Sequence, residues 1–133
     1  MTTPQIIAHR GASYLAPENT LVAFRKAMEI GADGVEMDVQ KTYDNELVIH
    51  HDYMVDMHTD ISGQIYDLTM GELKALDFGS WKDAIYANER IATLQEALEL
   101  CASMEGTQVQ LELKSPLEDD PDFVPRVLDA VRA

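Results

Sequence analysis

The stretch Gly34-Val35-Glu36-Met37-Asp38-Val39 alternates apolar side chains with carboxylates, as a β-strand does when its two faces meet different surroundings. Side chains two positions apart on a strand share a face, so Glu36 and Asp38 project together while the apolar residues pack against helices. A buried carboxylate without a partner costs several kcal/mol or takes up a proton. This strand therefore predicts a sheet with helices on one face and a cation or a water-filled cleft on the other.

Three other apolar runs have the length of strands. Tyr43-Asp44-Asn45, which offers turn chemistry, separates the strand at 34–39 from the next run, and segments with helical periodicity lie between the others. The strands are predicted at residues 5–9, 46–51 and 109–114, and the helices at about 20–30, 69–78, 93–105 and 124–131. Strands that alternate with helices favour a parallel sheet, either a doubly wound sheet or a (β/α) barrel. Polar residues after several strands are typical of the barrel, whose catalytic groups lie at the carboxyl ends of its strands. We therefore predict a TIM-type (β/α) barrel within the α/β class.

The length of the chain limits how much of a barrel it can form. Eight strand and helix pairs need about 250 residues. The 133 residues here hold four such pairs, which predicts the first four β/α units, or half a barrel. We expect a single domain over residues 1–133 that is incomplete at its C-terminus. Within it, residues of about 52–90 have a weaker pattern and are interpreted as an excursion on the rim of the barrel.

The charge and cysteine content disfavour several classes of protein. The chain has 10 basic and 24 acidic residues and a net charge of −14, which repels nucleic acid and anionic membrane surfaces. Cys101 is the only cysteine, so no intrachain disulfide forms, and a reducing compartment suits the free thiol. The N-terminus has no signal-peptide pattern, and no run approaches the ~20 apolar residues of a membrane span. We therefore expect a cytoplasmic protein that neither binds nucleic acid nor inserts into a membrane.

Glu112, in the predicted strand 109–114, supplies a third carboxylate in addition to Glu36 and Asp38. Carboxylate oxygens are hard ligands that suit magnesium, calcium or manganese rather than zinc. A divalent cation is therefore implied at the ends of these strands. The alternative is that Glu36 pairs with a basic residue and Glu112 with Lys114, so that ion pairs fill the barrel interior.

His9 and His51 end two other predicted strands and are candidates for acid and base chemistry. Taken singly, each is better explained as a hydrogen-bonded structural histidine. The carboxylates on the other strands shift the interpretation toward acid and base roles. His50 lies on the opposite face of its strand, so only one of the two neighbouring histidines can reach the cleft. Arg10 and Lys114 could hold a phosphate group, unless Arg10 is only a surface residue.

Several short segments carry a family resemblance. They are Ala8-His9-Arg10-Gly11, Pro17-Glu18-Asn19-Thr20, Gly34-Val35-Glu36-Met37-Asp38-Val39, His51-Asp52, Thr93-Leu94-Gln95-Glu96-Ala97-Leu98 and Leu111-Glu112-Leu113-Lys114. In this order they resemble the glycerophosphodiester phosphodiesterase family, and the resemblance runs from Ile6 to Lys114. It implies a TIM barrel that hydrolyses glycerophosphodiesters to glycerol 3-phosphate and an alcohol.

The resemblance also implies a role for each candidate residue. Glu36, Asp38 and Glu112 would bind a divalent metal, magnesium or calcium. His9 and His51 would act as the acid and the base, and Arg10 and Lys114 would contact phosphate. The nucleophile would be water, or the neighbouring glycerol hydroxyl by way of a cyclic phosphate.

Two departures from the family pattern lie outside the implied ligands. Ala92 stands where the family usually has a proline, and Met57-His58-Thr59 replaces an Arg-Thr-Thr run. A barrel phospholipase of the sphingomyelinase D type shares paired histidines and acidic metal ligands. The absence of a signal peptide and of cysteine pairs speaks against that secreted group.

Half a barrel would leave the strands 5–9 and 109–114 with open edges and the inner face exposed to water. Three interpretations stay open. The chain is a fragment of a longer enzyme, or two copies close edge to edge into a homodimer, or it is an inactive or partner-dependent half that binds metal or phosphate esters. Every implied site residue of this half is present, which favours catalytic ancestry.

Overall fold

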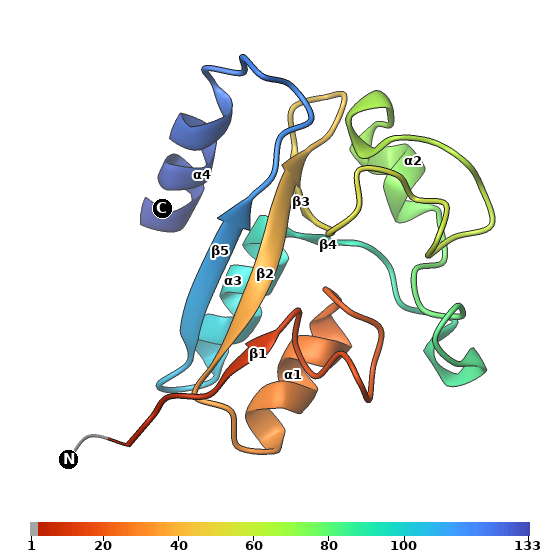
Figure 1. Ribbon diagram of the computed structural model, residues 1–133. Coiled ribbons are helices and arrows are strands. Elements are labelled where there is room, and N and C mark those ends of the chain that lie inside the picture. Colours follow the sequence, from red (N-terminus) through yellow and green to blue (C-terminus); the bar gives the residue numbers. More distant parts are fainter. Residues whose placement is uncertain (1–2) are drawn as a thin grey trace.

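In the computed structural model, which describes residues 3–133, strand β2 (Gly34–Lys41) is the centre of the sheet (Figure 1). Strands β1 (Ile7–His9) and β5 (Gln108–Leu113) pair with β2 in parallel, on opposite sides of it. The register places His9 beside Glu36, and Asp38 beside Glu112. Paired residues of neighbouring strands share a face, so these polar side chains lie on one face of the sheet.

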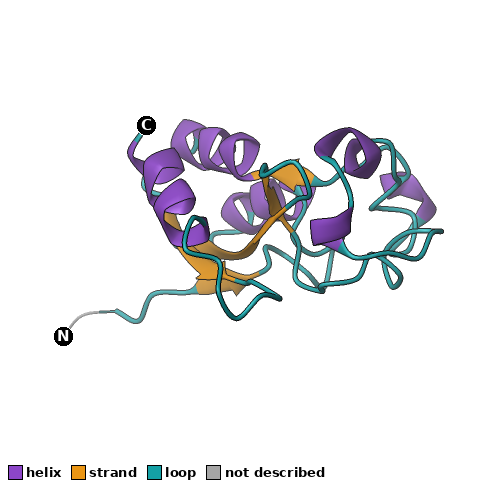
Figure 2. Cartoon of the chain, turned by 90° about the horizontal axis from the view of Figure 1, so that it is seen from above, coloured by secondary structure: helices purple, strands orange, loops and turns teal. Residues whose placement is uncertain are grey.

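Three helices cover the other face of the sheet (Figure 2), namely α1 (Leu21–Glu29), α3 (Leu94–Ser103) and α4 (Phe123–Arg132). Val35, Met37 and Val39 of β2 are fully buried in this layer. Their partners on the helices are Phe24, Ala27, Leu94, Ala97, Cys101, Phe123 and Val127. The two longest helices, α3 and α4, have 10 residues each, and no helix within residues 3–133 is long and apolar enough to cross a membrane.

Threonine side chains start three of the helices. Thr20, Thr69 and Thr93 precede α1, α2 (Met70–Lys74) and α3, and each hydroxyl accepts a hydrogen bond from the amide three residues later. At α3 the Glu96 side chain also accepts a hydrogen bond from the Thr93 amide, which completes a capping box. The predicted starts of these helices are therefore confirmed.

The prediction that residues 46–51 form a parallel strand is wrong. Strand β3 (Leu47–Ile49) is antiparallel to β2, and β4 (Ala92–Thr93) is antiparallel to β3. A turn closed by the hydrogen bond from the Thr42 amide to the Glu46 carbonyl joins β2 to β3. This turn is too short for a parallel connection, which needs about a dozen residues or more. The sheet therefore has three parallel strands, and the β/α units are β1–α1, β2–α3 and β5–α4 instead of the four predicted.

The segment between β3 and β4 packs around an apolar cluster of its own. The buried members of that cluster are Val48 of β3 and, from the segment itself, Val55, Ile65, Leu73, Phe78 and Ile91. Besides α2 the segment contains two short 3₁₀ helices, η1 (Ile65–Asp67) and η2 (Ala84–Tyr86). Its interpretation as a rim excursion, and the extent of the domain, stay predictions.

Strands β1 and β5 pair only with β2 among the described residues, so their outer edges are open. Ile6, directly before β1, is 65% exposed, and Leu113 at the end of β5 is 36% exposed. The open edges agree with a partial barrel, and the homodimer stays a prediction.

Candidate functional site

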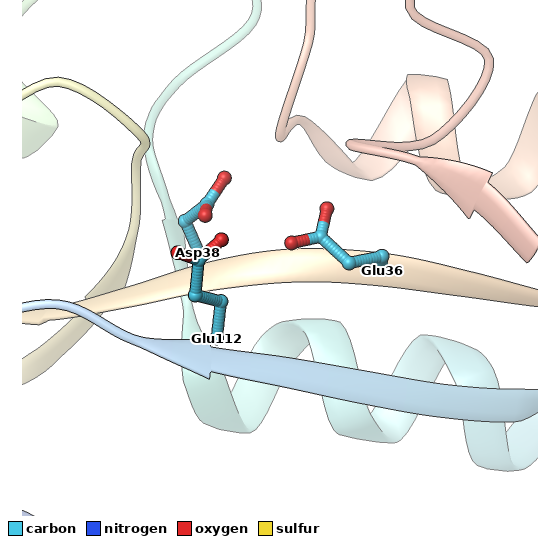
Figure 3. Close-up of side chains that lie close together, drawn as sticks. All are labelled: Glu36, Asp38 and Glu112. Atoms are coloured by element: carbon cyan, nitrogen blue, oxygen red, sulfur yellow. The ribbon is translucent and has the colours of Figure 1, made fainter.

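Glu36 and Asp38 of β2 and Glu112 of β5 meet on the face of the sheet that the helices leave uncovered. Each offers one carboxylate oxygen, and these three oxygens lie within 4.8 Å of one another. Figure 3 shows the three side chains on the side of the strands opposite α3. We call these three residues the carboxylate cluster. The structure thus brings together the acidic residues to which the strand pattern pointed.

Asp38 is the deepest member of the carboxylate cluster, with no exposed surface. Its Oδ2 accepts a hydrogen bond of 2.9 Å from Asn19 Nδ2, and its backbone amide donates one of 3.3 Å to Asn19 Oδ1. Its Oδ1 is buried and has no hydrogen-bond partner among the described residues. A buried carboxylate oxygen without a partner is costly unless a cation neutralises it, so Asp38 Oδ1 has the properties of a metal ligand.

The electrostatics of the carboxylate cluster also favour a cation. Burial raises the pKa of Glu36, and the negative charges of Asp38 and Glu112 raise it further. The Arg10 amide, which donates to Glu36 Oε1 at 3.1 Å, and the nearby His9 lower this pKa without reversing the shift. A divalent cation would offset the repulsion, and a donor set made only of oxygen suits magnesium or calcium better than zinc.

His9 is the last residue of β1, and Arg10 follows it directly. His9 Nε2 is 3.8 Å from Glu36 Oε1, and 67% of the His9 side chain is exposed. Arg10 has a left-handed φ of 61°, and its amide donates a hydrogen bond of 3.0 Å to the Glu36 carbonyl. Its guanidinium Nε lies 3.7 Å from Asp38 Oδ2, and its side chain is 22% exposed. Arg10 is therefore held against the carboxylate cluster and is not a free surface residue.

Two residues of the loop before α1 hold this part of the site, and the sequence alone assigned them no role. Glu18 Oε2 accepts a hydrogen bond of 2.9 Å from Arg10 Nη1. Asn19, which has a left-handed φ of 58°, is the residue that orients Asp38. The position of an asparagine directly before the capping Thr20 was the available signal, because asparagine tolerates the left-handed conformation better than most residues.

The pKa of Glu18 is lowered to about 2, chiefly by the nearby His58 and further by Arg10. Such a carboxylate stabilises the fold above its unfolded pKa of 4.5, and this contribution is lost as the pH falls toward 2. We expect Glu18→Gln to lower the free energy of unfolding near neutral pH by about 1 to 2 kcal/mol, after allowance for solvent screening. Urea unfolding measures this difference, and a difference that does not shrink in acid would contradict the assignment.

His51 lies directly after β3, and its Nδ1 is 2.7 Å from Asp52 Oδ1. Gln40 of β2 secures this turn, because its Nε2 donates hydrogen bonds of 2.7 Å to the carbonyls of both His50 and Asp52. His50 points the other way and is buried, which lowers its pKa to about 4 and leaves it uncharged near neutral pH. His51 remains 31% exposed, so it is the one of the pair that is accessible.

Lys114 follows β5, and its Nζ lies 3.7 Å from Glu112 Oε1. This is the ion pair that the alternative interpretation predicts, yet 56% of the Glu112 side chain remains exposed. Lys114 also lines an open pocket of about 520 Å³ together with His51 and Met57. His9 borders a different hollow of about 380 Å³. His9 and His51 therefore line two separate hollows.

Known proteins resemble this chain along most of its length. A model of the glycerophosphoryl diester phosphodiesterase family matches residues 9–126. A glycerophosphodiester phosphodiesterase of Caldanaerobacter subterraneus subsp. tengcongensis is 43% identical over 127 residues, which are 96% of this chain and 52% of the relative. Glycerophosphodiester phosphodiesterase 1 of Rattus norvegicus is 45% identical over 97 residues, which are 71% of this chain and 29% of the relative.

Solved structures share the fold. A phosphodiesterase from Oleispira antarctica in complex with the product sn-glycerol-3-phosphate has a TM-score of 0.87 and 39% identity, covering 97% of this chain and 52% of that one. A glycerophosphodiester phosphodiesterase from Agrobacterium tumefaciens has a TM-score of 0.84 and 32% identity, covering 98% and 53%. This likeness confirms the partial (β/α) barrel, and the chain spans about half the length of these proteins.

Proposed function

This chain belongs to the glycerophosphoryl diester phosphodiesterase family, and on that premise we propose that it carries the metal-binding part of an enzyme that hydrolyses glycerophosphodiesters to glycerol 3-phosphate and an alcohol. The observation that carries the proposal is the carboxylate cluster, in which Asp38 Oδ1 is buried and unpaired among the described residues. The sn-glycerol-3-phosphate bound to the Oleispira antarctica relative supports a phosphate ester as the ligand.

The carboxylate cluster and two basic residues would hold the phosphodiester. Magnesium or calcium held by Glu36, Asp38 and Glu112 would stabilise the negative charge that develops on the phosphoryl oxygens. Arg10 would bind phosphate oxygens through its forked guanidinium, and Lys114 would act as a point charge. The contact of Arg10 with Asp38, at 3.7 Å, keeps this guanidinium at the edge of the cluster.

His9 and His51 would move the protons. One ring accepts the proton of the attacking hydroxyl, from water or from the neighbouring glycerol hydroxyl, as that oxygen bonds to phosphorus. The other ring donates a proton to the alcohol oxygen as its bond to phosphorus breaks. Asp52 orients His51 through their contact of 2.7 Å, whereas His9 has Glu36 at 3.8 Å. The two rings are therefore held in different ways, which suits a division into acid and base.

Release of glycerol 3-phosphate from glycerophosphocholine, followed in a coupled assay, tests this proposal. We expect the release to require magnesium or calcium, to stop when EDTA removes the ion, and to resume when the ion is restored. The ion should also raise the melting temperature, because a ligand at about 100 times its Kd stabilises the folded chain by about 2.7 kcal/mol.

The matched control for this experiment is Glu105→Gln, which removes an exposed carboxylate outside the carboxylate cluster. It should leave both responses to the ion unchanged. Hydrolysis that persists in EDTA would contradict the role of the metal. A folded chain that binds the ion but releases no glycerol 3-phosphate would contradict the hydrolase.

A further inference from the structure

His58 lies between β3 and β4, in the Met57-His58-Thr59 run that departs from the family pattern. Its side chain is only 9% exposed. The ring packs edge-on against Trp81, with 4.6 Å between ring centroids, and against His50, with 5.0 Å. Edge-to-face contacts favour a defined ring orientation. His58 therefore presents its two nitrogens in fixed directions.

Each nitrogen of the His58 ring faces a carboxylate. Nε2 lies 3.8 Å from Glu18 Oε1, and Nδ1 lies 3.8 Å from Asp52 Oδ2. Nδ1 is buried and has no hydrogen-bond partner among the described residues, which calls for an explanation. A protonated imidazole donates from both nitrogens, so a charged His58 ring would face an acceptor on each side.

The same two carboxylates use their other oxygens to hold residues of the proposed site. Glu18 Oε2 accepts the hydrogen bond from Arg10, and Asp52 Oδ1 contacts His51. Glu18 precedes α1 and Asp52 follows β3, and His58 contacts both of them. The resulting series of contacts runs through Asp38, Arg10, Glu18, His58, Asp52 and His51.

The charged groups around the His58 ring come from separate elements. Glu18 approaches from the loop before α1, and Asp52 from the end of β3. Asp60 and Asp77 border the same small hollow as His58 and Trp81. His50 contributes no charge near neutral pH, because burial lowers its pKa to about 4. Carboxylates therefore approach the His58 ring from more than one side.

We propose that His58 is a positioning residue that holds Glu18 and Asp52, and through them Arg10 and His51, in the geometry that phosphodiester hydrolysis needs. This inference rests on the proposed function, since it assigns Arg10 and His51 their roles in that reaction. His58 acts only through the two carboxylates. A misplacement of about 1 Å at a reacting centre costs about 100-fold in rate, which sets the scale of the expected effect.

His58→Phe tests this inference, because it keeps an aromatic ring against Trp81 and His50 but removes both nitrogens. We expect kcat for release of glycerol 3-phosphate from glycerophosphocholine to fall about 10- to 100-fold, while KM changes less than about threefold. His58→Gln retains a hydrogen-bond donor, so we expect its kcat to be about tenfold higher than that of His58→Phe. The matched control is Trp81→Phe, which keeps an aromatic ring against His58, leaves both His58 nitrogens in place and removes the hydrogen bond of 2.8 Å from Trp81 Nε1 to the Phe78 carbonyl.

A second measurement does not depend on activity. In the ¹⁵N-labelled chain we expect the ring signals of His51 to shift in His58→Phe, while those of His9, outside the contact series, stay in place. Trp81→Phe should not move the His51 signals.

Three outcomes separate the possibilities. Unchanged kcat together with unchanged His51 signals would overturn the inference. Losses in Trp81→Phe equal to those in His58→Phe would also overturn it, because packing would then explain them. If the unaltered chain hydrolyses nothing while the His51 signals do move in His58→Phe, the proposed function fails and the positioning contacts stand.

Discussion

An Asp38→Asn chain is expected to lose up to about 1000-fold in kcat and the whole rise in melting temperature that magnesium or calcium produces. Asparagine has the shape of aspartate and can still accept the hydrogen bond from Asn19, so the fold should persist. It lacks the negative charge on the one oxygen of the carboxylate cluster that is buried and unpaired among the described residues. Calorimetric titration with each ion and the coupled assay measure the two losses.

Glu112→Gln is the matched comparison, since it removes the same charge from a side chain that is 56% exposed and near Lys114. Its expected loss is about 10- to 100-fold, smaller because solvent already screens this carboxylate. Without the ion, Asp38→Asn should melt no lower than the unaltered chain, because the substitution relieves repulsion within the carboxylate cluster. Ion binding of unaltered strength in Asp38→Asn would exclude Asp38 as a ligand.

Alternation along β2 made two members of the carboxylate cluster predictable, because residues two apart on a strand share a face, as Glu36 and Asp38 do. The place of Glu112 beside Asp38 depends on the parallel pairing of β5 with β2. That pairing follows only once the hairpin makes β3 antiparallel, so that β3 no longer stands between β2 and β5 in the parallel order. The residues that hold the cluster were not predictable in this way, because Asn19 reaches Asp38 only through a left-handed turn.

The direction of β3 shows a second limit of the sequence pattern. An apolar run of this length predicts a buried strand, but its periodicity is the same in a parallel and an antiparallel sheet. The connection from Thr42 to Glu46 determines the direction of β3, since it is long enough only for a hairpin. That hairpin places Gln40 beside the carbonyls of His50 and Asp52, and so it positions His51. The wrong direction for β3 therefore hid the role of Gln40.

Removal of either proposed acid or base, in His9→Ala or His51→Ala, is expected to lower kcat about 100- to 10,000-fold on glycerophosphocholine. Neither ring belongs to the carboxylate cluster, so both variants should keep the rise in melting temperature with magnesium or calcium. This retained response shows that the fold and the metal site are intact. Unaltered kcat in both variants would remove these two residues from the reaction.

A substrate with a better leaving group separates the two roles. Nitrophenolate departs from a glycerophosphodiester without taking up a proton, so a chain that lacks the acid should regain most of its loss on the nitrophenyl ester. A chain that lacks the base should not, because its nucleophile still has to lose a proton. We therefore expect one of His9→Ala and His51→Ala to recover on this substrate and the other to stay slow. Equal behaviour of the two variants on both substrates would contradict a division of acid and base between these rings.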